Sequence, residues 1–442
     1  MKRLFYTLLF FLPCMLIACG GSDDTPDGDN NPPVVAPPSE EPVDSRLLYN
    51  GIRLPEQWPP VRSSSSELEK GMSPFYLSDK PSVINISVGR QLFVDNFLIE
   101  STNLKRTFYY PEYYSGNPIL TPEQDWEKTG TKGAAFAAPF SDGVWYDEKE
   151  GKYKMWYMAG GGSYATSGAG VTCYAESTDG IHWTKPTLSI VAGTNIVDYN
   201  SERDASVIWL DKQESNASKR YKMFLVARES GKWRYHYKTS PDGKVWRAAV
   251  QSEPIADRST VYKNPFRNVW VYSMRHNVRV DANKLVRARD YNENTDPEAG
   301  TKKAEALLSA FWFGPWANEQ HHTDYPNIAP AIYNQDATPY ESIMLGFFSV
   351  WQGPENDVCA SDNVIKRNQV MVGYSRDGYS WFREDMNPFH AVNTTTSDAW
   401  NQGNLQSVAG APLIVGDKLY FYLSGRRLRG TQEITLSLIH IS

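Results

Sequence analysis

Four carboxylates stand where strands are expected to begin, and they are the residues that could do acid–base chemistry. Asp204 in RDAS and Asp257 in DRST occupy equivalent places at two predicted inner strands, and Asp324 in HTDYPN precedes a third. Glu341 begins the strand that follows. Facing carboxylates, one ionised and one protonated, are what cleavage of a glycosidic bond requires. For any single Asp, capping a turn or holding a structural Ca²⁺ stays open as an alternative.

The roles follow from the surroundings expected for each group. An apolar strand follows Glu341, so burial would raise the pKa of its carboxyl group and make it the acid. Asp257 would serve as base or nucleophile, and Asp204 would hold the sugar or stabilise positive charge in the transition state; these two roles are interchangeable. Asp142 in FSDG matches the pattern more loosely, and Asp336 or Asp324 follows if Glu341 faces elsewhere.

Aromatic side chains could form the sugar-binding surface. The chain has 14 Trp and 26 Tyr, more than the core of such a fold needs, and flat rings pack on sugar faces. Trp312, Trp316, Trp351 and Trp400 lie near loop segments and are preferred over Trp156 and Trp183, which we expect in the core. The predicted substrate-binding residues are Arg203, Arg258, Arg275, Tyr333, Trp351, Trp400 and Asn404.

Arginines cluster in one segment of the chain and favour a substrate with negative charge. Their guanidinium groups suit a carboxylate or a sulfate. These residues are Arg258, Arg275, Arg287 and Arg289. The alternative is that they pair with the acidic residues nearby in sequence, which are Asp290, Glu293 and Asp296.

The elements that must position these residues are indicated by the phrase Ser-x-Asp-Gly-x-x-Trp, which occurs three times. It spans residues 177–183, 240–246 and 375–381. Asp-Gly is typical of a hairpin turn, because Gly reaches positive φ and the Asp side chain bonds to its own turn. Each copy follows an alternating, tyrosine-rich run, so each closes a strand–turn–strand unit.

The spacing of this phrase predicts the fold. The first two copies are 63 residues apart, and the third follows after 135, about twice as far. A four-stranded repeat of this length is typical of a propeller blade. The sequence therefore predicts an all-β, five-bladed β-propeller over residues 91–435, with a truncated fifth blade and inner strands that meet at a central funnel. Residues 91–100, QLFVDNFLIE, are expected to form a strand that completes the last blade.

The segments outside the propeller are predicted from composition. Residues 1–19 combine Lys and Arg, a short apolar run and a small-residue stretch ending in Cys19, which indicates a lipoprotein signal with a lipidated Cys19. Residues 20–45 form a polar tether, and residues 46–90 a lead-in segment. Residues 436–442 continue no pattern of the repeats and are interpreted as a non-native tail, with a native terminal strand as the alternative. We expect a monomeric, surface-exposed outer-membrane lipoprotein, attached to the membrane through its lipid anchor only.

Composition narrows the classes of partner. The net charge is −6 and basic residues are scattered, so nucleic acid is not an expected partner. Cys173 and Cys359, the cysteines outside the signal, lack metal-ligand spacing and are expected as buried thiols, with a disulfide as the alternative. No cofactor is expected, with a structural Ca²⁺ at the ring of Asp residues as the one alternative.

Several segments resemble a known group of enzymes. FVDNFLIE, YKMWY, YAESTDGIHWTKP and GYSRDGYSW are similar to the five-bladed propeller glycosidases of families 32 and 43, and in particular to the branch with a family 32 N-terminal-like domain. The resemblance covers about residues 85–430 and implies a central acidic active site. The family 32 pattern has an Asp in blade one, an Arg-Asp in blade two and a Glu-Cys in blade three. Arg203-Asp204 matches the second element; the first has no clean counterpart and the third is absent.

Three functions compete at this point. The leading prediction is a glycoside hydrolase acting on a plant or algal polysaccharide or its oligosaccharides. The second is a non-catalytic surface lipoprotein that binds glycans on the same scaffold, and the third is a structural propeller whose Asp residues bind calcium. Paired carboxylates at the funnel favour the first, and an aromatic platform without such a pair favours the second.

Overall fold

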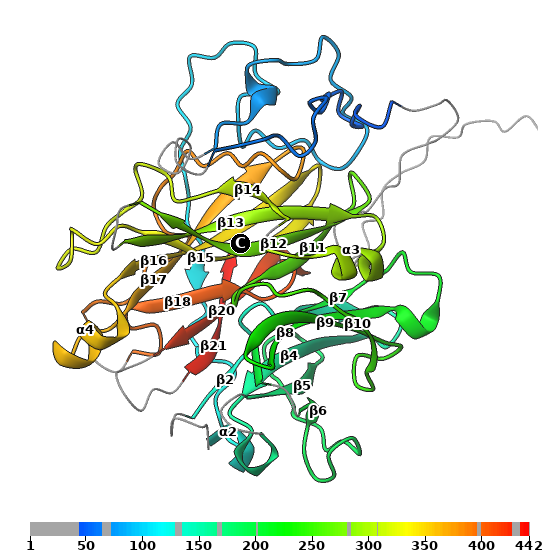
Figure 1. Cartoon of the computed structure of the whole chain (residues 1–442), viewed down its shortest axis with the longest axis vertical. Helices are drawn as coiled ribbons and strands as arrows, with labels where there is room; N and C mark the ends of the chain where they lie inside the picture. Colours follow the sequence, from blue (N-terminus) through cyan, green and yellow to red (C-terminus); the bar gives the residue numbers. More distant parts are fainter. Residues whose placement is uncertain are drawn as a thin grey trace, which may run out of the picture.

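The computed structural model describes residues 44–63, 72–128, 135–165, 170–199, 202–280, 284–306, 308–395, 399–426 and 434–441. These residues form four β-sheets in a propeller-like arrangement, with short helices in the connections (Figure 1). The helices are η1 (Phe75–Leu77), α2 (Asp125–Lys128), η2 (Gly162–Tyr164), η3 (Ala217–Lys219), α3 (Pro297–Lys303) and α4 (Asn356–Ser361). Within the described ranges no helix is long and apolar enough to span a bilayer. The predicted signal, Cys19 and most of the tether lie outside these ranges.

The first two sheets follow one another in sequence and are antiparallel. The first contains β2 (Ala137–Ala138), β3 (Val144–Asp147), β4 (Lys152–Ala159), β5 (Val171–Ser177) and β6 (Ile196–Asp198). The second contains β7 (Glu202–Leu210), β8 (Tyr221–Glu229), β9 (Lys232–Ser240) and β10 (Arg247–Gln251). β4 and β8 are the equivalent YKMWY and YKMFL segments. Both are buried over most of their length, because other sheets cover both of their faces.

The third and fourth sheets hold the rest of the strands. The third contains β11 (Thr260–Asn264), β12 (Val269–Arg279), β13 (Leu285–Asn294) and β14 (Ala310–Phe313). The fourth contains β15 (Ala331–Tyr340), β16 (Ile343–Gly353), β17 (Arg367–Ser375), β18 (Asn404–Val408), β19 (Leu413–Val415), β20 (Lys418–Arg426), β21 (Ile434–Ile441) and β1 (Glu112–Tyr113). The parallel pair Asn368 and Asn404 joins β17 to β18. The segments predicted as the fourth and fifth blades therefore share one sheet, and the structure has four sheets where five blades were expected.

The segment predicted to complete the last blade is not a strand. Residues 91–100 form turns and irregular chain, whereas β1 pairs with β21 at the edge of the fourth sheet. The buried Asp95 explains the difference, because its carboxylate accepts from Phe97 N and binds the Arg376 side chain. These bonds fix a turn where the alternating pattern predicted an extended chain. Most of the predicted tail, residues 436–442, lies in β21.

The lead-in segment packs against the fourth sheet, at the upper end of the view in Figure 1. A small core around Tyr76 and Phe97 joins it to the segment 91–100. The Tyr49 hydroxyl donates to the Ser342 carbonyl at 2.6 Å, in the turn between β15 and β16. The lead-in therefore covers one end of this hairpin.

The three repeated phrases form the same turn and connect neighbouring sheets. In each copy the Ser hydroxyl accepts from the Gly N–H, and the Asp carboxylate accepts from the two N–H groups that follow the Gly. Each turn also offers a backbone carbonyl to the preceding sheet. The donors are Trp156 for Gly243, Asn264 for Asp377 and Tyr422 for Gly180. Since Gly180 belongs to the first sheet and Tyr422 to the last, this third contact closes the ring.

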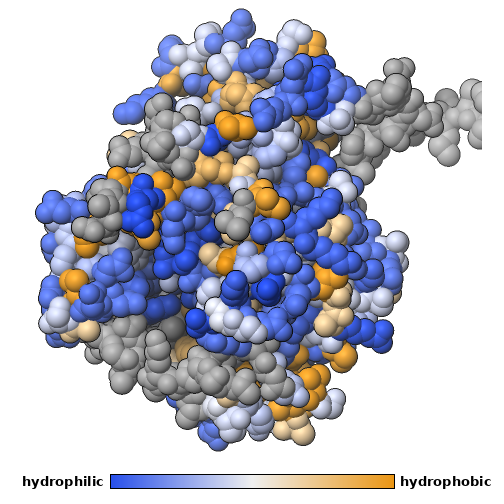
Figure 2. All heavy atoms as spheres, in the orientation of Figure 1, coloured by the Kyte–Doolittle hydropathy of each residue, from blue (hydrophilic) through white to orange (hydrophobic). Residues whose placement is uncertain are grey.

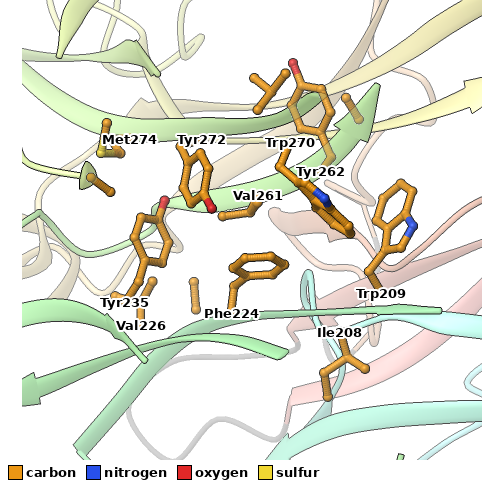
Figure 3. Packing of buried hydrophobic residues seen from close by; sticks show 14 of the residues in the cluster. Ile208, Trp209, Phe224, Val226, Tyr235, Val261, Tyr262, Trp270, Tyr272 and Met274 are labelled. Atoms are coloured by element: carbon orange, nitrogen blue, oxygen red, sulfur yellow. The ribbon is translucent and has the colours of Figure 1, made fainter. Parts of the chain in front are cut away.

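Aromatic side chains fill the space between sheets. Figure 3 shows Phe224 of β8 facing Trp270 and Tyr272 of β12, with ring centroids 5.4 and 6.0 Å apart. Such pairs stabilise the fold by about 0.5–1.5 kcal/mol each beyond area burial. The fully buried tryptophans are Trp156, Trp270, Trp312 and Trp381. Much of the aromatic content that suggested a sugar platform therefore belongs to the core.

Candidate active site

Inner strands from all four sheets line the central axis. A cavity of about 20 Å³ lies between Ser141, Val207 of β7, Val261 of β11, Ala337 of β15 and Val408 of β18. This volume holds about one water molecule, so a sugar has to bind outside it. Residues at or before the starts of these strands, among them Asp204, Asp257, Arg258 and Tyr333, lie together at one end of the axis, which we call the mouth. On the face seen in Figure 2, hydrophilic residues predominate and hydrophobic ones lie between them in small groups.

Breaks in strand pairing supply several of the side chains at this mouth. The pairing register shifts once in each of β7, β15 and β18. A β-bulge leaves a residue outside the ladder and re-aims its side chain, and bulges are frequent next to active sites. The residues left between paired positions are Asp204, Ala205, Tyr333 and Ser407. Asp204 and Tyr333 are therefore not paired in the sheet, and their side chains can contribute to the mouth.

Asp204 and Asp257 lie together, each with an arginine. Asp204 accepts from Arg258 N at 2.7 Å, and its other oxygen lies 3.1 Å from the Arg258 guanidinium. Asp257 pairs with Arg275, which also lies in the field of Asp204. Arg258 has a φ of +56°, a conformation that costs of order 1–3 kcal/mol for a residue with a side chain. This conformation brings both the backbone and the side chain of Arg258 to Asp204.

Asp142, the loose match in the first repeat, is fully buried beside the same group. One carboxylate oxygen lies 2.6 Å from Arg203 Nη2, and its other oxygen has no hydrogen-bond partner among the described residues. Burial raises the pKa of Asp142 to about 6, although the charges of Arg203 and Arg258 oppose the rise. Arg203, predicted to bind substrate, also donates to Thr172 and is almost fully buried, while its Nε has no hydrogen-bond partner among the described residues.

Asp336 is the second buried carboxylate at the axis, and it borders the central cavity. Its Oδ2 accepts from Val408 N at 3.1 Å and from Asn334 Nδ2 at 3.2 Å. Asn334 also donates to Ser141, the neighbour of Asp142. Burial raises the pKa of Asp336 to about 7, against the effect of these hydrogen bonds. A carboxyl group with such a pKa can exchange a proton near neutrality.

Glu341, predicted as the acid, lies elsewhere, and that assignment is wrong. It sits in the turn after β15, roughly 25 Å along the strand from Tyr333. Its carboxylate accepts from Arg90 N at 2.7 Å and from the Arg90 guanidinium at 2.8 Å. The group is buried beside Arg90 of the lead-in, at the opposite end of the hairpin from Asp204 and Asp257. Glu341 therefore fixes the lead-in segment to the fourth sheet.

Other predicted site residues also lie apart from this mouth. Asp324 is exposed in a loop beside His322. Trp351 packs with Ala331 and Phe311 in a small core, and Trp312 and Trp316 are buried. Trp400 packs edge-on against Tyr113 at 5.1 Å. These tryptophans are therefore explained by packing.

Asn404 lies close to two basic residues that the sequence did not suggest. Its Nδ2 donates to the Lys366 carbonyl at 3.3 Å, and Asn404 pairs with Arg426 across β18 and β20. The ring of Phe140 lies 5.3 Å from the Arg258 guanidinium and 5.9 Å from that of Arg426. Lys366 and Arg426 stand at strand ends without any motif around them, so only the fold brings them to the site.

The described residues contain no group of three or more His, Cys, Asp or Glu side chains that could hold a metal ion. Cys173 is buried, Cys359 is partly buried, and both are free thiols. Burial strongly raises the pKa of the Cys173 thiol, which disfavours the thiolate.

No protein-family model and no curated protein matches the chain. Among solved structures, it is similar to a protein described as a glycoside hydrolase, with 12% identity, a TM-score of 0.47 and coverage of 74% of this chain and 91% of that one. An N-acetylgalactosamine deacetylase from F. plautii in complex with blood group B trisaccharide has 11% identity and a TM-score of 0.46, over 75% of this chain and 94% of that one. A fructofuranosidase from Schwanniomyces occidentalis complexed with fructosylnystose has 12% identity and a TM-score of 0.43, over 77% of this chain and 60% of that one.

Proposed function

We propose that the chain is a glycoside hydrolase that acts on a plant or algal polysaccharide or its oligosaccharides at the mouth of the axis. The observation that carries the proposal is that carboxyl groups in two different environments lie along the axis and at its mouth. Asp204 and Asp257 are held by arginines, whereas Asp142 and Asp336 are buried with raised pKa values. Acid–base cleavage of an acetal needs one carboxyl group that holds a proton near neutrality and a second one in a different environment.

Asp336 is our candidate for the acid, because its pKa of about 7 keeps a proton available at neutral pH. Asp204 would be the ionised partner, as nucleophile, base or stabiliser of positive charge. Arg258 binds Asp204 through backbone and side chain, so the carboxylate keeps one orientation at the mouth. Asp142 is the alternative acid, since one of its oxygens has no partner in the described part of the chain.

A second function, glycan binding without turnover, is favoured by a specific observation. Asp142, Asp204 and Asp257 each already have a guanidinium partner. An ion-paired carboxylate is a weaker base and nucleophile than a free one, but it still accepts hydrogen bonds from sugar hydroxyl groups. This alternative predicts saturable binding of an oligosaccharide without any cleavage.

The deciding experiment is a screen of the mature chain against defined oligosaccharides, with products and binding measured in the same samples. Asp204→Asn and Asp336→Asn should each lower turnover by about 100-fold or more without loss of fold. Asp324→Asn is the matched control, because Asp324 is exposed and away from the mouth. Binding with no product supports the second function, and equal turnover by Asp336→Asn contradicts its role as acid.

We also propose that the chain works at the cell envelope as a monomeric outer-membrane lipoprotein. The motif that ends in Cys19 and the polar stretch after it support this proposal.

A further inference from the structure

Tyr333 lies among basic side chains from four different parts of the chain. The guanidinium carbons of Arg258 and Arg287 lie 5.4 and 4.8 Å from the centre of its ring. Lys366, before β17, and Arg426, at the end of β20, act on the same phenol. Burial would raise the pKa of Tyr333, but these four charges together lower it. The phenol therefore lies in a strongly positive local field.

Several of these charges have no carboxylate partner. Arg258 is paired with Asp204, and Arg275 with Asp257. For Arg287, Lys366 and Arg426, the described residues provide no ion pair. The cationic groups at this mouth therefore outnumber the two carboxyl groups, those of Asp204 and Asp257, that pair with members of the cluster.

The acidic residues closest in sequence do not neutralise the arginines. Pairing with them was the alternative explanation for the cluster; none of the three forms an ion pair with these arginines in the described part of the chain, although the charge of Asp290 acts on Arg289. Asp290 binds His276, Glu293 binds Arg267, and Asp296 accepts from Ala299 N at the start of α3.

Guanidinium N–H groups in the cluster also lack acceptors. Arg275 Nε, Arg287 Nη1 and Arg426 Nε are buried and have no hydrogen-bond partner in the part of the chain that the structure describes. A buried donor without an acceptor is costly, and guanidinium donors match the oxygens of a carboxylate or a sulfate in spacing and charge. The side-chain oxygen of Asn404 is likewise without a partner there.

We propose that Arg287, Lys366 and Arg426, around Tyr333, form a binding site for the anionic group of an acidic sugar, either a carboxylate or a sulfate. This inference rests on the proposed function, because the acidic sugar would be the substrate that binds at the same mouth. The ligand's oxygens would accept from the unpartnered guanidinium groups and balance the positive charge. A hydroxyl group would satisfy the donors but leave that charge in place, so an acidic sugar binds in preference to its neutral counterpart.

The test is a calorimetric titration of the mature chain with paired probes. The probes are oligogalacturonate, alginate oligosaccharide and sulfated galactan oligosaccharide, each beside its carboxyl-reduced or desulfated form. We expect at least one acidic probe to bind about tenfold or more tightly than its neutral pair. Arg287→Gln and Arg426→Gln should each remove most of this preference, while affinity for the neutral probe stays the same. Arg247→Gln, at an exposed arginine of β10, is the matched control and should change nothing.

A second readout does not depend on those variants folding. An anion bound in the cluster should raise the pKa of Tyr333, which is seen as a phenol absorbance change that Tyr333→Phe abolishes. Equal affinity for every acidic and neutral pair, or an absorbance change that persists in Tyr333→Phe, overturns the inference. Tight acidic binding without cleavage contradicts the glycosidase and leaves this site intact. Cleavage of a neutral sugar, without any preference for the acidic probes, supports the glycosidase and contradicts this anion site.

Discussion

Arg203 of the second sheet donates to Asp142 of the first across 2.6 Å, and both side chains are almost fully buried. This contact ties two sheets together at the axis, directly beside the mouth. It also keeps a proton-exchanging carboxyl group in a fixed position, because Arg203 is held in turn by Thr172.

Replacing Arg203 with Met should therefore destabilise the fold strongly. Loss of one partner of a buried ion pair costs about 3–5 kcal/mol, because the other charge is left uncompensated. Urea unfolding at pH 8 should show this loss, and a smaller one at pH 5, where Asp142 can take up a proton. Arg228→Met, which breaks an exposed pair with Glu202, should cost less than about 1 kcal/mol. A similar loss in both variants would contradict the importance of the buried pair.

The contribution of Asp336 to stability should fall as the pH rises from about 4 to about 7. Its pKa is raised from 3.8 to about 7 in the folded chain, so the folded state binds this proton more tightly than the unfolded state does. The resulting stabilisation is complete below the unfolded pKa and is lost at about 1.4 kcal/mol per pH unit up to the folded pKa. The melting temperature of Asp336→Asn, plotted against pH, should lack this decrease over the same range. Asp324→Asn should follow the parent, and an unchanged slope in Asp336→Asn would rule out this explanation.

Gly180→Ala should weaken the closure of the ring. Gly180 has a φ of +74°, and an added Cβ would lie 2.8 Å from the Tyr422 hydroxyl of the last sheet. Gly231→Ala is a matched control, since its φ of +79° imposes similar backbone strain but its Cβ would meet nothing within 4 Å. We expect Gly180→Ala to lose about 1–3 kcal/mol more than Gly231→Ala in denaturant unfolding. Equal losses would mean that backbone strain alone matters.

Cys19→Ala should release the protein from the membrane fraction of the native host. The predicted lipid is the only anchor proposed, so its loss leaves no other attachment. Fractionation followed by immunoblotting measures the effect, with Cys173→Ala as the control. Equal partitioning of the Cys19→Ala variant and the parent would disprove the anchor.

The sequence predicted the parts of this fold that depend on local chemistry. The Asp-Gly turns and the strands before them follow from short-range patterns, whereas Asp204 and Asp257 could be compared only by aligning the repeats. Glu341 was misplaced because a strand pattern does not state which end of a hairpin faces the axis. β17 and β18 belong to one sheet because of a single long-range pair, Asn368 with Asn404. No local sequence pattern predicts this pair.

The residues that make up the basic cluster were predicted only in part, for the same reason. Arg258, Arg275 and Arg287 lie in one segment of the sequence, so the sequence alone predicted that they form a cluster. Lys366 and Arg426 come from distant strand ends and reach Tyr333 only through the closed arrangement of sheets. The pairing of Asp290 with His276 was equally hidden, because either residue could have faced solvent.

The bulges in β7, β15 and β18 have a consequence for how this protein could change over evolution. An unpaired residue in a strand can be lost, or another gained, while the ladder on either side keeps its pairing. Single-residue insertions and deletions at Asp204, Tyr333 or Ser407 would therefore exchange the side chain presented at the mouth without rebuilding a sheet. Relatives with different ligands should differ in length at these three positions, and not only in residue type.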